Sequence, residues 1–269
     1  MSGIRYVLLD PTGNLTCLVL DPVPPERRGA VTAALMDRCE QVGYLTAPRD
    51  PRARARLQMM GGEFCGNASM ATAAWLASGG DAGDGRETEM LLEVSGAESL
   101  VPCTARREGE AWRASAGMPL PRAAEELEIL GIPLSAVFFP GMAHLIYEGA
   151  PLTRERAEEL IRAAADRLSE PAVGLMQWRE AEGRMTPLVL VRESGTLVWE
   201  TACGSGTTAV ACRKTRLAER SLTVPVSQPG GTLEAETEWR DGEIRRAVLR
   251  GKVRIGPVSM LKIDTGESR

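Results

Sequence analysis

Histidine is nearly absent from the sequence, and the cysteines lack the close spacing that zinc sites use. The chain of 269 residues has a single histidine, His144, and its six cysteines are far apart: Cys17, Cys39, Cys65, Cys103, Cys203 and Cys212. A structural zinc ion takes four Cys or His ligands, commonly from pairs only a few residues apart. We therefore expect no metal site.

Long apolar runs are also missing. No run approaches the roughly 18 apolar residues of a membrane-spanning helix, and the first residues, MSGIRY, do not resemble the apolar core of a secretory signal. We therefore expect a cytoplasmic protein that has no membrane partner and keeps its cysteines reduced.

The sequence has no excess of positive charge. Its 32 lysines and arginines face 36 aspartates and glutamates, for a net charge of -4, and 43% of its residues are hydrophobic. This is the composition of a globular protein, and it argues against a nucleic-acid partner, because phosphate backbones are bound by basic surfaces. The length suffices for one large domain or two of ordinary size.

One short motif occurs twice in the chain. CGNASMATA begins at Cys65 and CGSGTTAVA begins at Cys203, and each follows strand-like residues and opens a helical, alanine-rich segment. The repeat predicts two similar halves, each with a cysteine at a helix N-terminus. We place the halves at residues 1–118 and 119–256, and we expect residues 257–269 to form a closing strand that returns to the first half. Prolines and glycine within residues 119–135 suggest a linker.

Two cysteines at helix N-termini form a chemically useful pair. A helix N-terminus offers unpaired N–H groups and partial positive charge, which favour a thiolate and bind carboxylates. If the two termini meet in one cleft, one thiolate can remove a Cα proton while the other thiol protonates the opposite face. Such a two-base reaction needs no cofactor. Cys65 alone would be interpreted as a small buried residue, as we interpret the four cysteines outside the motif.

Several segments occur in an order typical of one enzyme family: TGNLTCLVLD, CGNASMA, GMAHLIYEG, VGLMQW, ACGSGTTAV and GPVSML. With them the chain resembles, over most of its length, the diaminopimelate epimerase family of pyridoxal-independent racemases and epimerases. The resemblance implies an α+β fold of two pseudo-symmetric domains, each a curved mixed or antiparallel sheet or barrel wrapped around a central helix. It also implies a homodimer.

The resemblance implies roles for individual residues. Cys65 and Cys203 would be the catalytic acid/base pair. The substrate contacts that it implies are Asn14, Gly66, Asn67, His144, Gly204 and Ser205. Glu200, three residues before Cys203, either tunes the Cys203 thiol or is a surface charge at a strand end.

The sequence departs from the diaminopimelate epimerases where the far end of their substrate is bound. Met142 and Ala172 stand where the family has asparagines, and SGTLVWE replaces a Glu-Arg-Gly-Ala-Gly element. Each unmet hydrogen bond to a second zwitterion would cost about 1 to 3 kcal/mol. Diaminopimelate therefore fits poorly.

A different side chain fits better. Glu40, in CEQVGY, is either a partner for a basic or imidazole side chain or a solvated carboxylate at a helix end. The form GGEFCGNA of the first motif resembles the histidine racemases of the family more than its diaminopimelate enzymes. The sequence thus predicts an isomerase, a cofactor-independent amino acid racemase, with histidine as the favoured substrate. Two alternatives remain: a diaminopimelate epimerase with unusual distal contacts, and a non-catalytic protein that binds an amino acid or another carboxylate.

Overall fold

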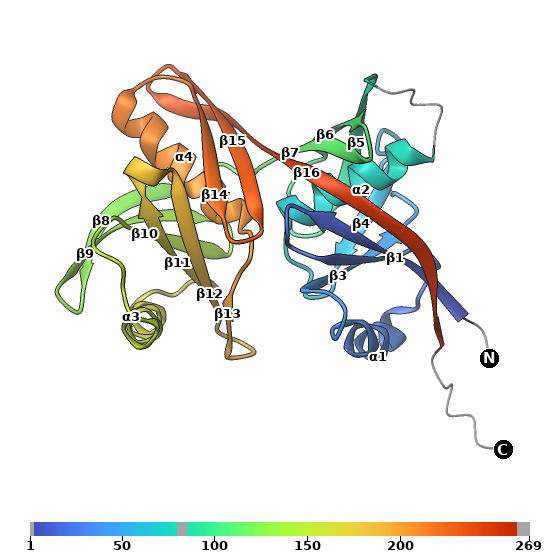
Figure 1. Cartoon of the computed structure of the whole chain (residues 1–269), viewed down its shortest axis with the longest axis horizontal. Helices are drawn as coiled ribbons and strands as arrows, with labels where there is room; N and C mark the ends of the chain where they lie inside the picture. Colours follow the sequence, from blue (N-terminus) through green and yellow to red (C-terminus); the bar gives the residue numbers. More distant parts are fainter. Residues whose placement is uncertain (1–2, 80–84, 263–269) are drawn as a thin grey trace. The chain divides into compact units, whose positions relative to one another are not determined.

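The computed structural model describes residues 3–79 and 85–262, in which strands predominate over four α-helices. This is an α+β protein (Figure 1). The helices are α1 (Pro25–Leu35), α2 (Gly66–Ser78), α3 (Arg154–Arg167) and α4 (Gly204–Ala218). Within the described ranges, no helix is both long and apolar enough to cross a membrane.

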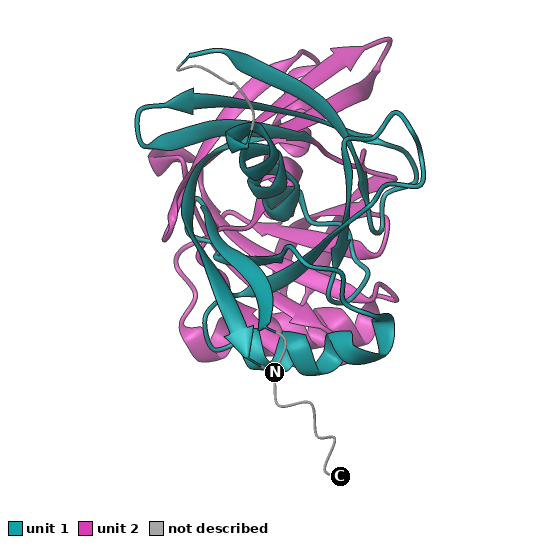
Figure 2. Cartoon of the chain, turned by 90° about the vertical axis from the view of Figure 1, so that its right-hand side faces the viewer, with its two compact units in different colours: residues 1–116, 250–269 teal, residues 117–249 magenta. Residues whose placement is uncertain are grey.

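The chain divides into two compact units (Figure 2). Unit 1 comprises Met1–Ala116 and Arg250–Arg269, and unit 2 comprises Gly117–Leu249. The last strand, β16 (Glu243–Lys262), contributes residues to both units. Pro257, the expected start of a separate closing strand, lies inside β16, and residues 263–269 lie outside the described residues.

The strands of unit 1 pair in the order β1 to β7 and then β16, and β16 also pairs with β1. Their bounds are β1 (Gly3–Pro11), β2 (Thr16–Val19), β3 (Gln41–Thr46), β4 (Ala55–Met59), β5 (Glu87–Val94), β6 (Val101–Glu108) and β7 (Ala111–Gly117). β2 and β3 are parallel, as are β4 and β5. Parallel neighbours need a crossover, and α1 and α2 provide these two crossovers.

Helix α2 lies inside the curved strands of unit 1, as Figure 2 shows. Ten of its 13 residues are buried, most of them alanine or another small residue. A helix that is apolar all round packs in a protein interior, and small side chains let strands approach it from several sides. α1 packs through Val31 and Leu35 against another apolar cluster, which includes Val19 and Tyr44 of the strands.

The strands of unit 2 pair in the order β8, β9, β10, β11, β12, β14, β15 and β16, with β13 beside β12. Their bounds are β8 (Ala123–Ile129), β9 (Ile132–Phe139), β10 (Met142–Tyr147), β11 (Ala172–Arg179), β12 (Arg184–Val191), β13 (Thr196–Trp199), β14 (Leu222–Gln228) and β15 (Gly231–Arg240). The crossovers again contain helices: α3 connects parallel β10 and β11, and α4 lies between parallel β12 and β14.

Alternate residues of the unit 2 strands belong to two apolar clusters. On β11, Met176 and Trp178 belong to the cluster that contains α4 residues, whereas Val173 and Leu175 belong to the cluster that contains α3 residues. Successive side chains of a strand point to opposite faces, so the sheet is covered by a helix on each face. This explains why β11 is apolar at almost every position.

The prediction of a linker at residues 119–135 is wrong, because most of this segment forms β8 and the start of β9. The two strands pair up to Ile129 and Ile132, which leaves Leu130 and Gly131 as a two-residue turn with φ of 53° and 73°. Positive φ at both turn residues is the geometry that joins tight hairpins. Gly131 therefore marks a hairpin turn.

Candidate active site

Cys65 is the N-cap residue of α2 in unit 1. Its backbone is extended, with φ of −134° and ψ of 112°, and its sulfur accepts a hydrogen bond from the N–H of Ala68 at 3.4 Å. The carbonyl of Cys65 accepts the first intrahelical bond, from the N–H of Ser69. Gly66 and Asn67, both buried, form the intervening turn. The local sequence thus places a thiol and N–H groups together.

Cys203 is the N-cap residue of α4 in unit 2, with the same local geometry. Its φ is −106° and its ψ is 107°, and its sulfur accepts a hydrogen bond of 3.4 Å from the N–H of Gly206. Gly204 and Ser205 occupy the first turn, and the Ser205 hydroxyl lies 3.5 Å from the Cys203 sulfur. Each unit therefore presents a thiol beside N–H groups that suit a carboxylate.

In unit 1, the thiol of Cys65 begins a chain of hydrogen-bonded side chains. It donates to Oε1 of Gln41 at 3.0 Å, and Nε2 of Gln41 donates to Oδ1 of Asn14 at 2.6 Å. Nδ2 of Asn14 in turn donates to Oε2 of Glu40 at 2.9 Å. The structure thus connects three of the predicted residues, Asn14, Glu40 and Cys65, and adds Gln41 between them.

The parallel pairing of β2 with β3 explains this arrangement. Thr16 pairs with Gln41 in the register of these strands, so residues at the start of both strands lie side by side. The backbone N–H groups of Glu40 and Gln41 both donate to the carbonyl of Leu15. Helix α1 ends at Leu35, so Glu40 lies directly before β3 rather than at a helix end.

In unit 2, Glu200 acts on the Cys203 thiol. Burial and, after it, the carboxylate of Glu200 raise the pKa of Cys203 well above its ordinary value, and Ser205 and the N–H of Gly206 oppose this. Both the loss of water and a nearby negative charge disfavour a thiolate. Cys203 is only 4% exposed, so the thiol form predominates at neutral pH.

A glutamine also contacts the second cysteine, but through the backbone. Oε1 of Gln228 accepts the N–H of Cys203 at 2.7 Å, and Nε2 of Gln228 donates to Oγ1 of Thr207 at 2.9 Å. The Thr207 hydroxyl donates to the carbonyl of Cys203 at 2.7 Å. All three residues are buried. The motif does not point to Gln228, which is 25 residues later than Cys203.

His144 lies on β10 in the interior of unit 2. Its ring is fully buried, and neither ring nitrogen has a hydrogen-bond partner among the described residues. Burial lowers the pKa of His144 to about 3, so the ring is neutral. A Cβ at Gly174 would collide with both the His144 ring and Met176, and a Cβ at Gly206 would collide with Met176 and approach Cys203. Met176 therefore lies between His144 and the first turn of α4.

The turn before Cys65 is held by the turn that follows β5. The Ser95 hydroxyl donates to the carbonyl of Glu63 at 2.8 Å and accepts the N–H of Met59 at 2.9 Å. Gly96 has a φ of 70°, and a Cβ there would collide with the backbone of Glu63 and Phe64. Only glycine suits position 96, because another residue would be strained by the positive φ and its Cβ would collide with this backbone. The local sequence does not predict the contact between the two turns.

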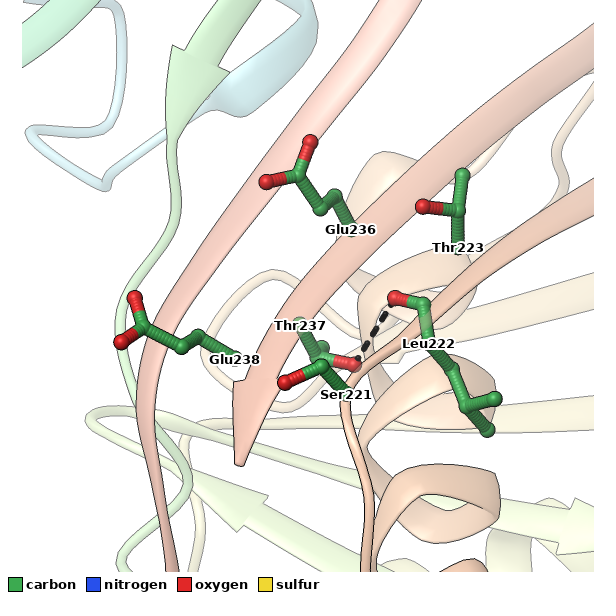
Figure 3. A pocket seen from close by; sticks show the side chains of 6 residues that line it. All are labelled: Ser221, Leu222, Thr223, Glu236, Thr237 and Glu238. Atoms are coloured by element: carbon green, nitrogen blue, oxygen red, sulfur yellow. Dashed lines mark hydrogen bonds between the residues drawn. The ribbon is translucent and has the colours of Figure 1, made fainter. Parts of the chain in front are cut away.

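The four cysteines outside the motif are buried free thiols, and Cys65 is the one partly exposed cysteine in the chain. A hollow of about 400 Å³ on unit 2 lies elsewhere, against paired residues of β14 and β15 (Figure 3). It is lined by Ser221, Leu222, Thr223, Glu236, Thr237 and Glu238. None of these residues belongs to the predicted site, and the hollow contains no cysteine.

Residues 3–259 match the family model described as the histidine racemase CntK N-terminal domain. A histidine racemase of Fusobacterium nucleatum subsp. nucleatum is 30% identical over 269 residues, which cover 94% of this chain and 97% of that protein.

Two solved structures have a similar fold. A predicted epimerase from Pseudomonas aeruginosa has a TM-score of 0.71 at 20% identity, and covers 97% of this chain and 99% of its own. A probable proline racemase from Agrobacterium radiobacter K84 has a TM-score of 0.68 at 17% identity, with 98% and 94% covered. At these identities the likeness shows a shared fold and nothing more.

Proposed function

Because the chain belongs to the histidine racemase CntK family, we propose that it interconverts L- and D-histidine without a cofactor, through Cys65 and Cys203. The observation that carries this proposal is the pair of cysteine N-caps. Each unit contains one helix whose first turn donates an N–H to the sulfur of its own cap at 3.4 Å. A protein that only binds a carboxylate would need the N–H groups but no thiol.

The proposed reaction moves two protons. One cysteine, as thiolate, takes the Cα proton of the substrate and becomes a thiol, and the other thiol gives its proton to the opposite face and becomes a thiolate. The reverse reaction starts from that second state. The N–H groups at the two helix N-termini would bind the substrate carboxylate and stabilise negative charge that develops beside Cα. These groups belong to Gly66, Asn67, Gly204 and Ser205.

We assign Glu200 to the control of Cys203. The carboxylate contributes to the raised pKa of the Cys203 thiol. While Glu200 is ionised, this favours the thiol form of Cys203, the form that delivers a proton in the direction in which Cys65 is the base. Cys203 becomes a base when its proton passes to the substrate, and the negative charge of Glu200 then makes the thiolate a stronger base.

Glu40 is the proposed partner of the substrate's imidazole. It is the one acidic residue in the hydrogen-bonded chain that leads to Cys65. A carboxylate accepts hydrogen bonds at both oxygens and would favour an imidazole N–H. Asn14, which donates to Glu40, holds the carboxylate in place. His144 is proposed as a further substrate contact, because its neutral ring can donate one hydrogen bond and has no partner among the described residues.

We also propose that the two units are pseudo-symmetric halves. Each contains two helical crossovers between parallel strands, and in each unit the second crossover helix begins at the motif cysteine. Unit 1 has its strands curved around that helix, as the family resemblance predicts (Figure 2). The homodimer stays a prediction.

Solvent deuterium tests the proposed reaction. In D₂O the enzyme should incorporate deuterium at Cα of L-histidine as optical rotation is lost, which NMR and polarimetry follow together. Cys65→Ala and Cys203→Ala should each abolish racemisation. Cys212→Ala is the matched control, since Cys212 lies buried within α4. Racemisation at the parent rate in both single variants would show that the assignment is wrong.

The same assay separates the alternatives. Diaminopimelate and a panel of L-amino acids are tested beside histidine at equal concentration. Turnover of diaminopimelate in preference to histidine would indicate the epimerase alternative. Thermal stabilisation by histidine without any loss of optical rotation would indicate a binding protein.

A further inference from the structure

The hydrogen-bonded chain that ends at Cys65 has a fixed direction. Each hydrogen bond needs one donor and one acceptor, and an amide side chain can present either its oxygen or its nitrogen. This hydrogen-bonded series contains two side-chain amides, Gln41 and Asn14, between the Cys65 thiol and the Glu40 carboxylate. Its direction depends on which groups at its ends cannot reverse.

Glu40 is the end that cannot reverse. An ionised carboxylate only accepts hydrogen bonds, so Asn14 must turn its NH₂ group toward Glu40 and its oxygen toward Gln41. Gln41 must then turn its own NH₂ group toward Asn14, which leaves its oxygen facing Cys65. The distances of 2.9, 2.6 and 3.0 Å along this path agree with three hydrogen bonds of the same direction.

Thr16 supports the same direction, although its hydroxyl can turn and donate instead if both amides reverse. Its hydroxyl donates to the backbone carbonyl of Asn14 at 3.2 Å, so its oxygen accepts the second N–H of the Gln41 amide, at 2.7 Å. Both N–H groups of this amide therefore have acceptors. Turning over the Gln41 amide alone, with Asn14 held by Glu40, would place its oxygen against the oxygens of Thr16 and Asn14.

We infer that Gln41 is a positioning residue for Cys65, and that Glu40 sets its direction through Asn14, so that Cys65 is held as the hydrogen-bond donor in its thiol form. A thiol can donate to the Gln41 oxygen, whereas a thiolate cannot and is repelled by the same oxygen. This opposes the N–H of Ala68, which points at the sulfur and favours a thiolate. Gln41 thus favours the thiol form of Cys65, the form that delivers a proton in the direction in which Cys203 is the base.

The other cysteine is controlled differently. Gln228 accepts from the backbone N–H of Cys203 rather than from its thiol, and the protonation of Cys203 depends on burial and Glu200. The glutamine that contacts each cysteine comes from a different position: Gln41 begins β3, two elements before α2, and Gln228 ends β14, after α4. The two thiols can therefore be tuned separately by substitution.

Alkylation of Cys65 by iodoacetamide measures this effect directly. Only the thiolate reacts quickly, and Cys65 is the one partly exposed cysteine, so mass spectrometry of its peptide gives a rate at each pH. Gln41→Met should move the midpoint of this pH profile down by about 0.5 to 1 pH unit, the worth of one hydrogen bond. Glu40→Gln should move the midpoint in the same direction. An amide at this position can donate to Asn14, which allows the hydrogen bonds from Glu40 to Cys65 to reverse their direction.

Gln41→Glu is the opposite test. A carboxylate at this position still accepts from the thiol but adds negative charge beside it, so the midpoint should rise. Gln58→Met is the matched control. Gln58 lies on β4, opposite Tyr44 of β3, and is not one of the side chains in the hydrogen-bonded series that leads to Cys65. It should leave the midpoint unchanged.

Other titratable groups on the surrounding elements stay in place in Gln41→Met and in the control. The acidic groups and thiols are Glu40 beside β3, Glu63 before α2, Asp10 on β1, Cys17 on β2, Cys103 and Glu108 on β6, and Glu87, Glu89 and Glu93 on β5. The phenols and basic groups are Arg5 and Tyr6 on β1, Tyr44 on β3, Arg56 on β4, and Arg106 and Arg107 on β6. A difference in the alkylation midpoint between Gln41→Met and the parent is therefore caused by the loss of the Gln41 side chain.

An unchanged midpoint in both Gln41→Met and Glu40→Gln would overturn the inference, as would an equal shift in Gln58→Met. If Gln41→Met does not unfold cooperatively on heating, the nearly isosteric Glu40→Gln decides alone. The inference rests on the proposed function only for the role of Cys65 as acid. Alkylation does not require turnover, so a protein that fails to racemise histidine can still show the shift.

Discussion

The backbone N–H of Cys203 and the side chain of Gln228 form a buried hydrogen bond of 2.7 Å. Together with Thr207, Gln228 closes a ring of hydrogen bonds around the backbone of the cysteine. The position of the Cys203 thiol therefore depends on β14, the strand that follows its own helix.

Gln228→Leu should destabilise the protein by about 1 to 3 kcal/mol, because it leaves the buried N–H of Cys203 without its acceptor. Urea unfolding followed by circular dichroism gives this value. Racemisation should also slow, with a lower kcat, since the thiol is no longer held in place. Gln58→Leu, on a partly exposed position of β4, should stay within about 0.5 kcal/mol of the parent. Equal stability of the two variants would contradict the role of the ring.

Gly96→Ala should reduce both stability and activity. The new Cβ would collide with the backbone of Glu63 and Phe64, directly before Cys65. Gly109→Ala separates this collision from strain, because Gly109 also has a positive φ, 62°, but has open space around it. We expect the control to lose about 1 to 2 kcal/mol and to keep its kcat, and Gly96→Ala to lose more stability and most of its kcat.

His144 should make stability depend on pH. Its pKa is about 3 in the folded protein and about 6.5 when unfolded. The unfolded chain thus binds a proton that the folded protein rejects, so this contribution to stability is full above pH 6.5 and is lost as the pH falls toward 3. Between pH 7 and pH 5 the loss is about 2 kcal/mol.

His144→Leu removes this dependence and provides the check. Urea unfolding of parent and variant is measured at pH 7, 6 and 5, where few carboxylates of either protein titrate. The parent should lose about 2 kcal/mol more than the variant over this range. Parallel pH curves would mean that folding does not lower the pKa of His144.

Glu200→Gln should lower the pKa of the Cys203 thiol. Burial, the larger cause of the raised pKa, remains in the variant, but the repulsion between thiolate and carboxylate is removed. In the direction that uses Cys203 as base, the rising limb of kcat/KM against pH should move to lower pH. The opposite direction, which uses Cys65 as base, serves as the internal control. A shift of the same size in both directions would show that Glu200 does not act on Cys203 alone.

Local sequence was enough to predict the two cysteine N-caps. In both copies of the motif the thiol, the glycine after it and the N–H that bonds to the sulfur lie within four residues, at Cys65–Ala68 and Cys203–Gly206. Hydrogen bonds over so short a span follow from the helix itself. The repeat and the family resemblance, both visible in the residues, also led to histidine racemases, the family that the comparisons then showed.

Only the tertiary structure decided what surrounds each thiol. Gln41 reaches Asn14 and Cys65 because β2 and β3 are parallel and Thr16 pairs with Gln41, and nothing in the local sequence sets that register. Gln228, Gly96 and Met176 likewise contact the site from strands and turns far along the chain. Residues 119–135 show the same limit, since their prolines and glycine suit a loop, and only pairing with neighbouring strands makes them a hairpin. Motif chemistry depends on adjacent residues, whereas the tuning of that chemistry depends on strand pairing.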